Sequence, residues 1–335
     1  MNIHVDIGHP SDVHFFRHAM AAWREHGHGV FTTCRGIPVA QQLLEGFGIV
    51  YEVVSRKRAG LALGLELIEH AARLWPRLRK NRIDLSVSFG GTFTVHAALL
   101  AGCRRVVFYD TDTATAANRI TYPFASHIVT PAVYPGNLGR KHRTYRGLKE
   151  LAYLQPGRFS ADASVPAKYG LDGDTPYSVV RFSAWKASHD MGLETAALED
   201  KLELMAALQR RGNVLVVPEG RPPPELAAFC RPIEPQDFHH LLYHAGCCVT
   251  EGASTASEAA VLGTPVLYIN PLQPCYIPWL VREGLLSLSP PGDDMRAALD
   301  RLPRKDELRE KASAFVAAQD DVTAFVVDFV ENLQR

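Results

Sequence analysis

The sequence lacks an imbalance of charge, a membrane-length apolar run and paired cysteines. Lys+Arg and Asp+Glu are both 36 in 335 residues, so no global field favours nucleic acid as a partner. No stretch reaches the roughly 18–20 apolar residues that span a bilayer, and the start, MNIHVDIGHP, has no signal-peptide pattern. The six cysteines form no C-x-x-C pair, which indicates reduced thiols. We expect a cytoplasmic protein that binds no nucleic acid.

What is present is typical of a globular α/β protein of two domains. The chain is 47% apolar and 21% charged, and its length favours two domains. Short apolar stretches such as Ile3–Ile7, Leu85–Phe89 and Tyr177–Phe182 alternate with helical patterns such as Val95–Leu100. This alternation predicts βαβ units and mostly parallel sheets.

The two halves are separated by a segment rich in Pro, Gly, Ser and Asp, from about Gln155 to Asp174, which we interpret as a linker. We predict one Rossmann-like domain at 1–160, a second at 175–318, and a final helical segment at 319–335. Two such domains would face each other across a cleft. Ligands of open α/β sheets bind at the carboxyl ends of the strands.

The stretch from Thr250 to Pro271 contains the strongest candidate site. A buried strand at 247–250 is followed by four small residues, and we predict a helix at 256–262 and a second strand at 266–269. The free N–H groups of a helix start attract anions, and small side chains admit a phosphate. The four small residues of this predicted turn are Gly252, Ala253, Ser254 and Thr255.

Glu258 on the predicted helix has two interpretations. The T-x-x-E spacing from Thr255 to Glu258 favours a capping box that needs no ligand. Alternatively, the carboxylate accepts hydrogen bonds from the two hydroxyls of a ribose.

This stretch resembles the donor-nucleotide loop of GT-B glycosyltransferases and of the related UDP-N-acetylglucosamine 2-epimerases. The matching pieces are Gly252, Ser254 and Thr255, then Glu258, then Gly263-Thr264-Pro265, although the double glycine common in that loop is Gly252-Ala253 here. The resemblance implies a GT-B fold with its last helix crossing back to the first domain. It also implies that the turn holds the diphosphate of a nucleotide sugar, with UDP the expected nucleotide, and that Glu258 holds the ribose.

Several motifs, in order, resemble the DUF354 family over nearly the whole chain. They are G-x-P-x-x-V-H-F-F from Gly8, D-T-x-x-A…N…P from Asp110 through Asn118, Y-x-G-x-K-E-x-x-Y-L from Tyr145, and V-R-F-x-x-x-x-A-S-H-D from Val180.

His14 in the first of these motifs is our candidate general base, because an imidazole titrates near neutrality. Its alternative is a hydrogen bond to Asp12 or to the backbone. Asp12 either orients His14 or caps the helix, which we expect to be capped by Ser11 or Asp12. His9 is a weaker candidate base.

Arg181 at a strand end is the candidate to offset charge on a leaving UDP, and its alternative is a salt bridge at a sheet edge. Ser183 would donate to phosphate or cap a helix, and Glu219 would contact the nucleotide base. His189, followed by an aspartate, forms either a pair in the cleft or a surface turn. His239 and His240 lack metal-ligand spacing, and we expect a solvated face there.

Further residues are expected on the acceptor side of the cleft. Asp110 belongs to a D-x-D sequence that could bind a metal, but helix capping is favoured and we predict no metal and no cofactor. Lys149 and Glu150 either lie there or form an interdomain ion pair. The expected acceptor-side residues are His9, Gly90, Gly91, Asp110, Asn118, Lys149, Glu150 and His189.

Together these features predict a metal-independent glycosyltransferase that uses a nucleotide sugar, UDP-linked, and a sugar or lipid-linked acceptor in cell-surface polysaccharide or glycolipid synthesis. A non-hydrolysing UDP-sugar 2-epimerase is the alternative enzyme, although its H-R-x-E-N motif is replaced by residues 180–184. The third hypothesis is a subunit that binds a nucleotide sugar without catalysing a reaction. The predicted helix from Leu61 to Trp75 is apolar enough for peripheral contact with the inner face of the membrane, but we favour a core helix. The oligomeric state stays open.

Overall fold

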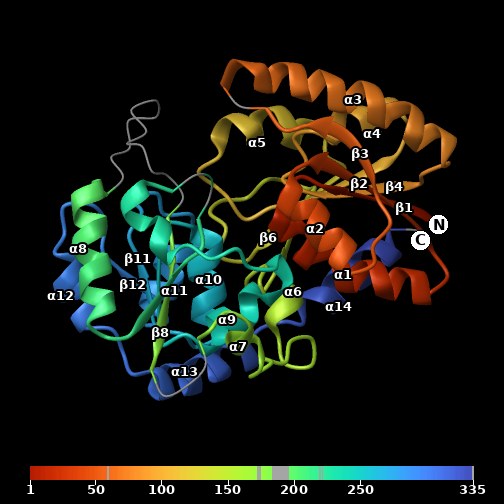
Figure 1. The fold of residues 1–335 in the computed structure, drawn as a ribbon. Coiled ribbons are helices and arrows are strands. Elements are labelled where there is room, and N and C mark those ends of the chain that lie inside the picture. Colours follow the sequence, from red (N-terminus) through yellow and green to blue (C-terminus); the bar gives the residue numbers. More distant parts are fainter. Residues whose placement is uncertain (59, 172–174, 183–195, 219, 221, 334–335) are drawn as a thin grey trace. The chain divides into compact units, whose positions relative to one another are not determined.

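The computed structural model describes the chain except residues 59, 172–174, 183–195, 219, 221 and 334–335 (Figure 1). The chain divides into an N-terminal unit, Met1–Tyr153 with Asp320–Arg335, and a C-terminal unit, Leu154–Gln319. Each unit is built on one parallel sheet, as the alternating pattern predicts. None of the described helices is long and apolar enough to cross a membrane.

The sheet of the N-terminal unit has the order β3-β2-β1-β4-β5-β6-β7. Its central strands are buried on both faces, which is typical of parallel sheets covered by helices; for example, Val5 pairs in register with Thr32 and Val87, and all three are buried. The strands are β1 (Asn2–Ile7), β2 (Gly29–Gly36), β3 (Glu52–Arg56), β4 (Leu85–Phe89), β5 (Arg104–Phe108), β6 (His127–Pro131) and β7 (His142–Tyr145).

Helices cover both faces of this sheet (Figure 1). On one face α1 (Pro10–Glu25) packs against α2 (Pro38–Gly46) and against the last helix, α14 (Val322–Asn332). The predicted return of the final helix to the first unit is therefore confirmed. On the other face α3 (Leu63–Lys80), after the short η1 (Gly60–Ala62), packs against α4 (Val95–Leu100). The remaining helices are α5 (Thr115–Thr121), η2 (Tyr122–Phe124) and α6 (Leu151–Leu154).

A buried polar network joins α3 to the strands beneath it. The Asp6 carboxylate accepts a hydrogen bond from Thr33 Oγ1 at 2.6 Å and lies 3.1 Å from His70 Nε2. On the same helix, Glu66 pairs with Arg35 at 2.7 Å and accepts from Ser55. Such groups remain buried only when they are paired.

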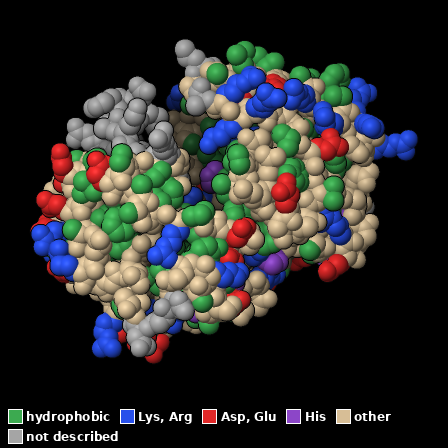
Figure 2. Space-filling view, in the orientation of Figure 1, with side chains coloured by type: hydrophobic (Ala, Val, Ile, Leu, Met, Phe, Trp, Pro, Cys, Tyr) green, Lys and Arg blue, Asp and Glu red, His purple; other side chains and the backbone are tan. Residues whose placement is uncertain are grey.

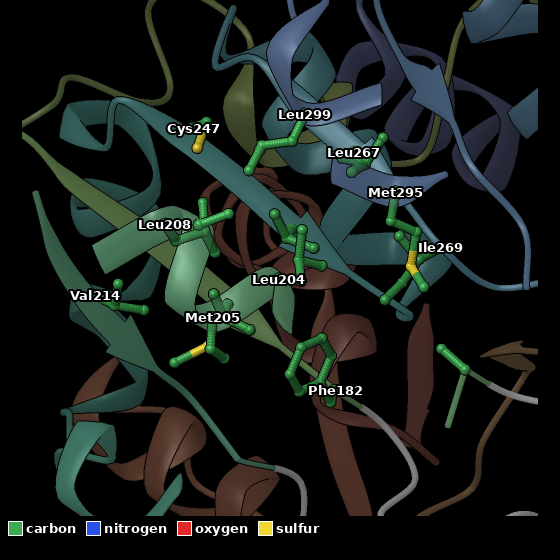
Figure 3. Packing of buried hydrophobic residues seen from close by; sticks show 14 of the residues in the cluster. Phe182, Leu204, Met205, Leu208, Val214, Cys247, Leu267, Ile269, Met295 and Leu299 are labelled. Atoms are coloured by element: carbon green, nitrogen blue, oxygen red, sulfur yellow. The ribbon is translucent and has the colours of Figure 1, made fainter. Parts of the chain in front are cut away.

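The C-terminal unit has the sheet order β12-β11-β10-β8-β9. Its core lies between this sheet and the helices α8 and α12, with Leu204 and Leu208 meeting Leu267 and Leu299 (Figure 3). The strands are β8 (Tyr177–Arg181), β9 (Asn213–Val216), β10 (Cys247–Thr250), β11 (Val266–Tyr268) and β12 (Ser287–Leu288). The helices are α7 (Val165–Lys168), α8 (Leu198–Gln209), η4 (Pro224–Phe229), η5 (Pro235–Asp237), α9 (Phe238–His244), α10 (Ala253–Val261), α11 (Tyr276–Arg282), α12 (Met295–Asp300) and α13 (Lys305–Ala317).

Candidate functional site

The loop after β1 is held by the Asp12 carboxylate. Its Oδ2 accepts hydrogen bonds from the backbone N–H groups of Gly8 (3.0 Å) and His9 (2.8 Å). The N-cap of α1 is His9, whose ring accepts from Ser11 N, and together these bonds form a capping box. The prediction that Ser11 or Asp12 would be the N-cap residue is therefore wrong, because Pro10 starts the helix earlier. Asp12 nevertheless takes part in the capping box, because its carboxylate accepts from the backbone N–H of His9.

Asp12 is also a buried ionisable group with a raised pKa. Burial raises the pKa of its carboxyl to about 7, against the opposing effect of the Gly8 and His9 hydrogen bonds and of the Lys149 charge. A carboxyl that titrates near neutrality can take up or release a proton at working pH. The sequence context of Asp12 did not indicate this raised pKa.

His14 lies two residues further along α1 and is buried. Its ring lies against Tyr153, with 5.2 Å between the ring centroids, and against Phe47 at 5.7 Å. The imidazole therefore packs against two aromatic rings.

A buried ion pair lies at the carboxyl end of β5 in the same unit. Lys149 Nζ is 2.9 Å from Asp110 Oδ2 and 4.0 Å from Glu150 Oε1, and all three residues are buried. Lys149 thus has an ion-pair partner within the N-terminal unit. Asp110 is engaged by this lysine and accepts from Thr111 Oγ1.

Gly90 and Gly91 are required by the backbone after β4. Both have positive φ, 78° and 73°, a conformation that favours glycine. A Cβ on Gly91 would also lie 2.7 Å from Val107. Asn118 on α5 donates to Tyr134 Oη at 3.3 Å and lines a pocket of about 710 Å³. The remaining lining residues of this pocket are Thr115, Arg119, Tyr122, Pro123, Ile128, Tyr134, Leu138, Arg140 and Lys141.

In the C-terminal unit, α10 follows β10 almost directly. Gly252 is the N-cap and the helix starts at Ala253, three residues before the predicted start. Ser254 and Thr255 therefore belong to the first helical turn and not to a loop. Because Gly252 has no side chain, α10 has no side-chain cap, and its first-turn N–H groups form the anion-binding type of helix start.

Glu258 does not form the capping box considered from sequence, because Thr255 lies within the helix and is not its N-cap. Its carboxylate is instead buried, with Oε1 3.0 Å from Nε2 of His239 on α9. His239 is itself buried, so the solvated face predicted for it is wrong. Sequence spacing could not reveal this pair, since 19 residues separate its members.

A second buried pair lies directly before the turn. Lys201 Nζ on α8 is 2.7 Å from Glu251 Oε1, and both side chains are almost fully buried. Thr250 Oγ1 accepts from Gly252 N at 2.9 Å. These contacts hold the backbone that leads into α10. Neither Lys201 nor Glu251 was singled out from sequence, because no motif marks them.

Arg181 ends β8, which lies inside the sheet between β10 and β9. Its guanidinium carbon lies 5.3 Å from the ring centroid of Phe238. Ser183, His189 and Glu219 lie outside the described residues. Within the described part of the chain, no group of three or more His, Cys, Asp or Glu could hold a metal ion.

This architecture defines a class of protein, the GT-B fold. The solved structures that resemble the chain include a UDP-GlcNAc 2-epimerase from Neisseria meningitidis bound to UDP-GlcNAc (TM-score 0.73, 13% identity, 99% of this chain and 100% of that chain). S. aureus MnaA with UDP is similar at TM-score 0.73 (11% identity, 99% and 96%). The spinosyn forosaminyltransferase SpnP is similar at TM-score 0.64 (14% identity, 100% and 99%).

Within this class the protein belongs to the family described as "Protein of unknown function (DUF354)", which matches residues 1–335. A curated relative, an uncharacterized protein of Methanocaldococcus jannaschii, is 23% identical over 300 residues, which is 81% of this chain and 82% of the relative. The family resemblance and the GT-B fold expected from sequence are confirmed.

Proposed function

We propose that the protein is a glycosyltransferase that takes its sugar from a UDP-linked donor and binds the donor at the start of α10. The observation that carries this proposal is the geometry of β10 and α10. A strand ends at Thr250, a helix starts at Ala253 without a side-chain cap, and a buried carboxylate, Glu258, follows in the second turn. The first-turn amides suit a diphosphate, and an anionic carboxylate suits the hydroxyls of a ribose.

The buried pairs around this segment support the proposal because they position it before any ligand arrives. His239 orients one oxygen of Glu258, and Lys201 fixes Glu251 at the base of the turn. A preorganised site loses less free energy of binding to ordering its own groups.

The transfer reaction needs a base and a stabilised leaving group. The acceptor hydroxyl attacks the anomeric carbon, the bond from that carbon to the UDP oxygen breaks, and the electron pair leaves with UDP. The acceptor proton goes to His14 or, through its raised pKa, to the ionised form of Asp12. Arg181, placed over Phe238, supplies positive charge for the diphosphate. No metal takes part in this proposed mechanism.

A 2-epimerase is the second candidate, since structures of this fold from Neisseria meningitidis and Methanocaldococcus jannaschii carry that name and contain UDP-GlcNAc. It would use the same donor site but would exchange the proton at C2 of the sugar. Incubation with UDP-sugars in D2O separates the two: deuterium at C2 indicates epimerisation, and acceptor-dependent release of UDP indicates transfer.

The donor site is tested by titrating UDP into the wild type and into Gly252→Ala. Gly252 has φ of −84°, and an added Cβ would lie 3.4 Å from Thr250 Oγ1 and 3.5 Å from Thr255 Oγ1, so the folded protein accepts the methyl group. We expect UDP affinity to fall about tenfold or more, because the methyl group occupies space that the phosphate needs.

Gly246→Ala is the matched control, since its Cβ would lie 3.4 Å from the nearest atom, Tyr177 O. Gly246 directly precedes β10 and so lies at the opposite end of the strand from α10. Unchanged UDP affinity in Gly252→Ala, with an unchanged melting temperature, would exclude this segment as the diphosphate site.

A further inference from the structure

The first half of the helix α3 buries charged side chains and exposes apolar ones, whereas its second half buries Leu74 and Leu78 in the core. Glu66 and His70 are fully buried beneath it, whereas Leu65 is 61% exposed and Ile68 is 69% exposed. A helix on a globular protein normally buries its apolar stripe and exposes its charges. Here the inward charges are satisfied by the network with Arg35 and Asp6, which leaves the outer apolar side chains without a partner within the unit.

The outer residues form one continuous stripe. Leu65, Ile68, Ala72 and Trp75 follow the spacing i, i+3, i+7, i+10, which places them on one side of a helix. The neighbouring α4 adds Leu100, which is 68% exposed. Of the thirteen large apolar side chains exposed in the described part of the chain, eight belong to α3, α4, α5 and η2: Leu63, Leu65, Ile68, Trp75, Leu99, Leu100, Ile120 and Phe124.

The same region is strongly basic. Between Arg56 and Arg119 there are eleven Lys and Arg but five Asp and Glu, a surplus of six in a chain whose total charge is balanced. Three of these acids are paired, Glu66 with Arg35, Glu69 with Arg58 and Arg73, and Asp110 with Lys149. Among the bases, Arg77 pairs with Glu52 outside this range. Figure 2 shows hydrophobic and basic side chains side by side over α3, at the top of the view.

We propose that this α3–α4 face, formed by Leu65, Ile68, Trp75, Leu100 and the basic residues around them, docks onto an anionic lipid surface. An apolar stripe with a tryptophan, bordered by arginine and lysine, suits the boundary between acyl chains and anionic headgroups. A second copy of the chain fits less well, because a two-fold pairing would bring the same basic residues face to face. The proposal does not depend on the donor site.

The test is sedimentation with vesicles. We expect the wild type to pellet with phosphatidylcholine vesicles that contain about 30% phosphatidylglycerol, and to do so about tenfold less with phosphatidylcholine alone or in high salt. Leu65→Gln with Ile68→Gln, and separately Arg79→Gln with Lys80→Gln, should each reduce binding about tenfold or more. All four residues are exposed, so these variants keep the fold, which thermal melting checks.

Matched controls lie in the C-terminal unit. Leu198→Gln with Val281→Gln removes two exposed apolar side chains, and Arg296→Gln with Arg301→Gln removes two exposed charges. Both controls should bind vesicles as the wild type does. Quenching by lipids brominated in the acyl chain should also affect Trp75, and Trp75→Phe should abolish that part of the signal.

Three results would overturn the proposal: a wild type that does not bind anionic vesicles, face variants that bind as the wild type does, or face variants that turn a dimer into monomers while vesicle binding is retained. The last would assign the face to a second copy. UDP titration of the face variants, with unchanged affinity expected, keeps this outcome separate from that of the donor site.

Discussion

At the scale of single residues, the ionisable side chains near the strand ends are held by buried partners. Lys149 pairs with Asp110, His239 with Glu258 and Lys201 with Glu251. Removing one partner of such a pair leaves the other buried without compensation, which costs more than the pair contributes. These residues should therefore respond strongly to substitution, in stability as well as in binding.

The first prediction concerns Asp12. Because its pKa is raised from 3.8 to about 7, the folded state holds a proton that the unfolded state has lost between these values. The protonated Asp12 carboxyl thus contributes to the free energy of unfolding. This contribution is fully present below about pH 4 and is lost as the pH rises through 7. Asp12→Asn, which keeps an oxygen acceptor for the Gly8 and His9 amides, should flatten this decline.

Unfolding free energies of the wild type and Asp12→Asn, measured by urea titration from pH 5 to pH 8, check the prediction. Parallel pH profiles for the two proteins would contradict it.

The second prediction concerns Glu258. Glu258→Gln keeps the size of the side chain and removes its charge, and UDP affinity should fall about tenfold through weaker hydrogen bonds to the ribose hydroxyls. His239→Gln should reduce the affinity less, because the proposed donor site uses His239 to orient Glu258 and not to contact UDP.

Calorimetric titration with UDP and with inorganic pyrophosphate checks this assignment. A loss with UDP but not with pyrophosphate is expected. Equal losses with both would place Glu258 at the phosphate and not at the ribose.

The sequence could indicate which loops contain candidate site residues, but not which partners their side chains contact. Glu258 stands out because it follows a strand, small residues and a helix start. Its partner His239 could not be found, since the contact depends on how α9 packs against α10. Asp12 was expected near the site, yet its raised pKa arises from burial that only the folded structure provides.

At the scale of elements, the first half of α3 is held against the sheet by the polar network under it. Glu66 pairs with Arg35 and accepts from Arg58 N at 2.7 Å, and it has no exposed surface. Glu66→Ala should destabilise the protein by about 3–5 kcal/mol, because the Arg35 guanidinium is left in a largely buried position without its carboxylate.

Glu69→Ala is the control on the same helix. Glu69 pairs with Arg58 and Arg73, which are more exposed, so the loss should be about 1 kcal/mol or less. Denaturant unfolding measures both changes, and equal effects would contradict the role given to the network.

Acid should weaken the same network. His70, His4 and Thr33 lower the pKa of Asp6 against the effect of burial, and burial lowers the pKa of His4 to about 4. The ionised Asp6 and the neutral His4 both contribute to stability at neutral pH. Each contribution is lost as the pH falls, and that of His4 is lost between pH 6.5 and about pH 4.

Elements with a clear local pattern were predicted well. The strand at Leu85–Phe89 and the helix at Val95–Leu100 agree with β4 and α4 residue for residue. The start of α10 was placed three residues late, because Gly252-Ala253-Ser254-Thr255 has turn composition while packing continues the helix through it. The strand β7 was missed, since the sequence His-Arg-Thr-Tyr of this edge strand has no apolar run.

At the scale of the whole molecule, the last sixteen residues belong to the first unit, although they follow the second in sequence. Val322, Val326 and Val330 on α14 are buried, and Thr323 Oγ1 donates to Ala152 O at 2.7 Å. The final helix thus completes the core of the N-terminal unit.

Truncation after Gln319 should therefore destabilise the N-terminal unit selectively. The removal of three buried valines alone should cost several kcal/mol, at about 1.5–3 kcal/mol for each side chain. Calorimetry should show the transition of the N-terminal unit at a lower temperature, with Trp23, buried against this unit's core, reporting its unfolding. A transition that does not change would contradict this role of α14.

The fold class could be predicted because apolar strand patterns that alternate with helical patterns specify parallel βαβ units, even where the exact bounds of the elements are wrong. The return of α14 followed from the family resemblance and not from periodicity. The exposure of Leu65, Ile68 and Trp75 on α3 could not be predicted, because these residues have the spacing of an ordinary core face. The structure shows that Glu66 and His70, together with Leu74 and Leu78, point inward instead.

The central claim is that the start of α10 binds the diphosphate of a UDP-sugar. Hydrogen exchange of backbone amides with and without UDP tests it most directly. Binding should slow exchange at Ala253, Ser254 and Thr255, whose amides would donate to the phosphates. UDP binding that leaves these three amides unprotected, while it protects others, would contradict the account.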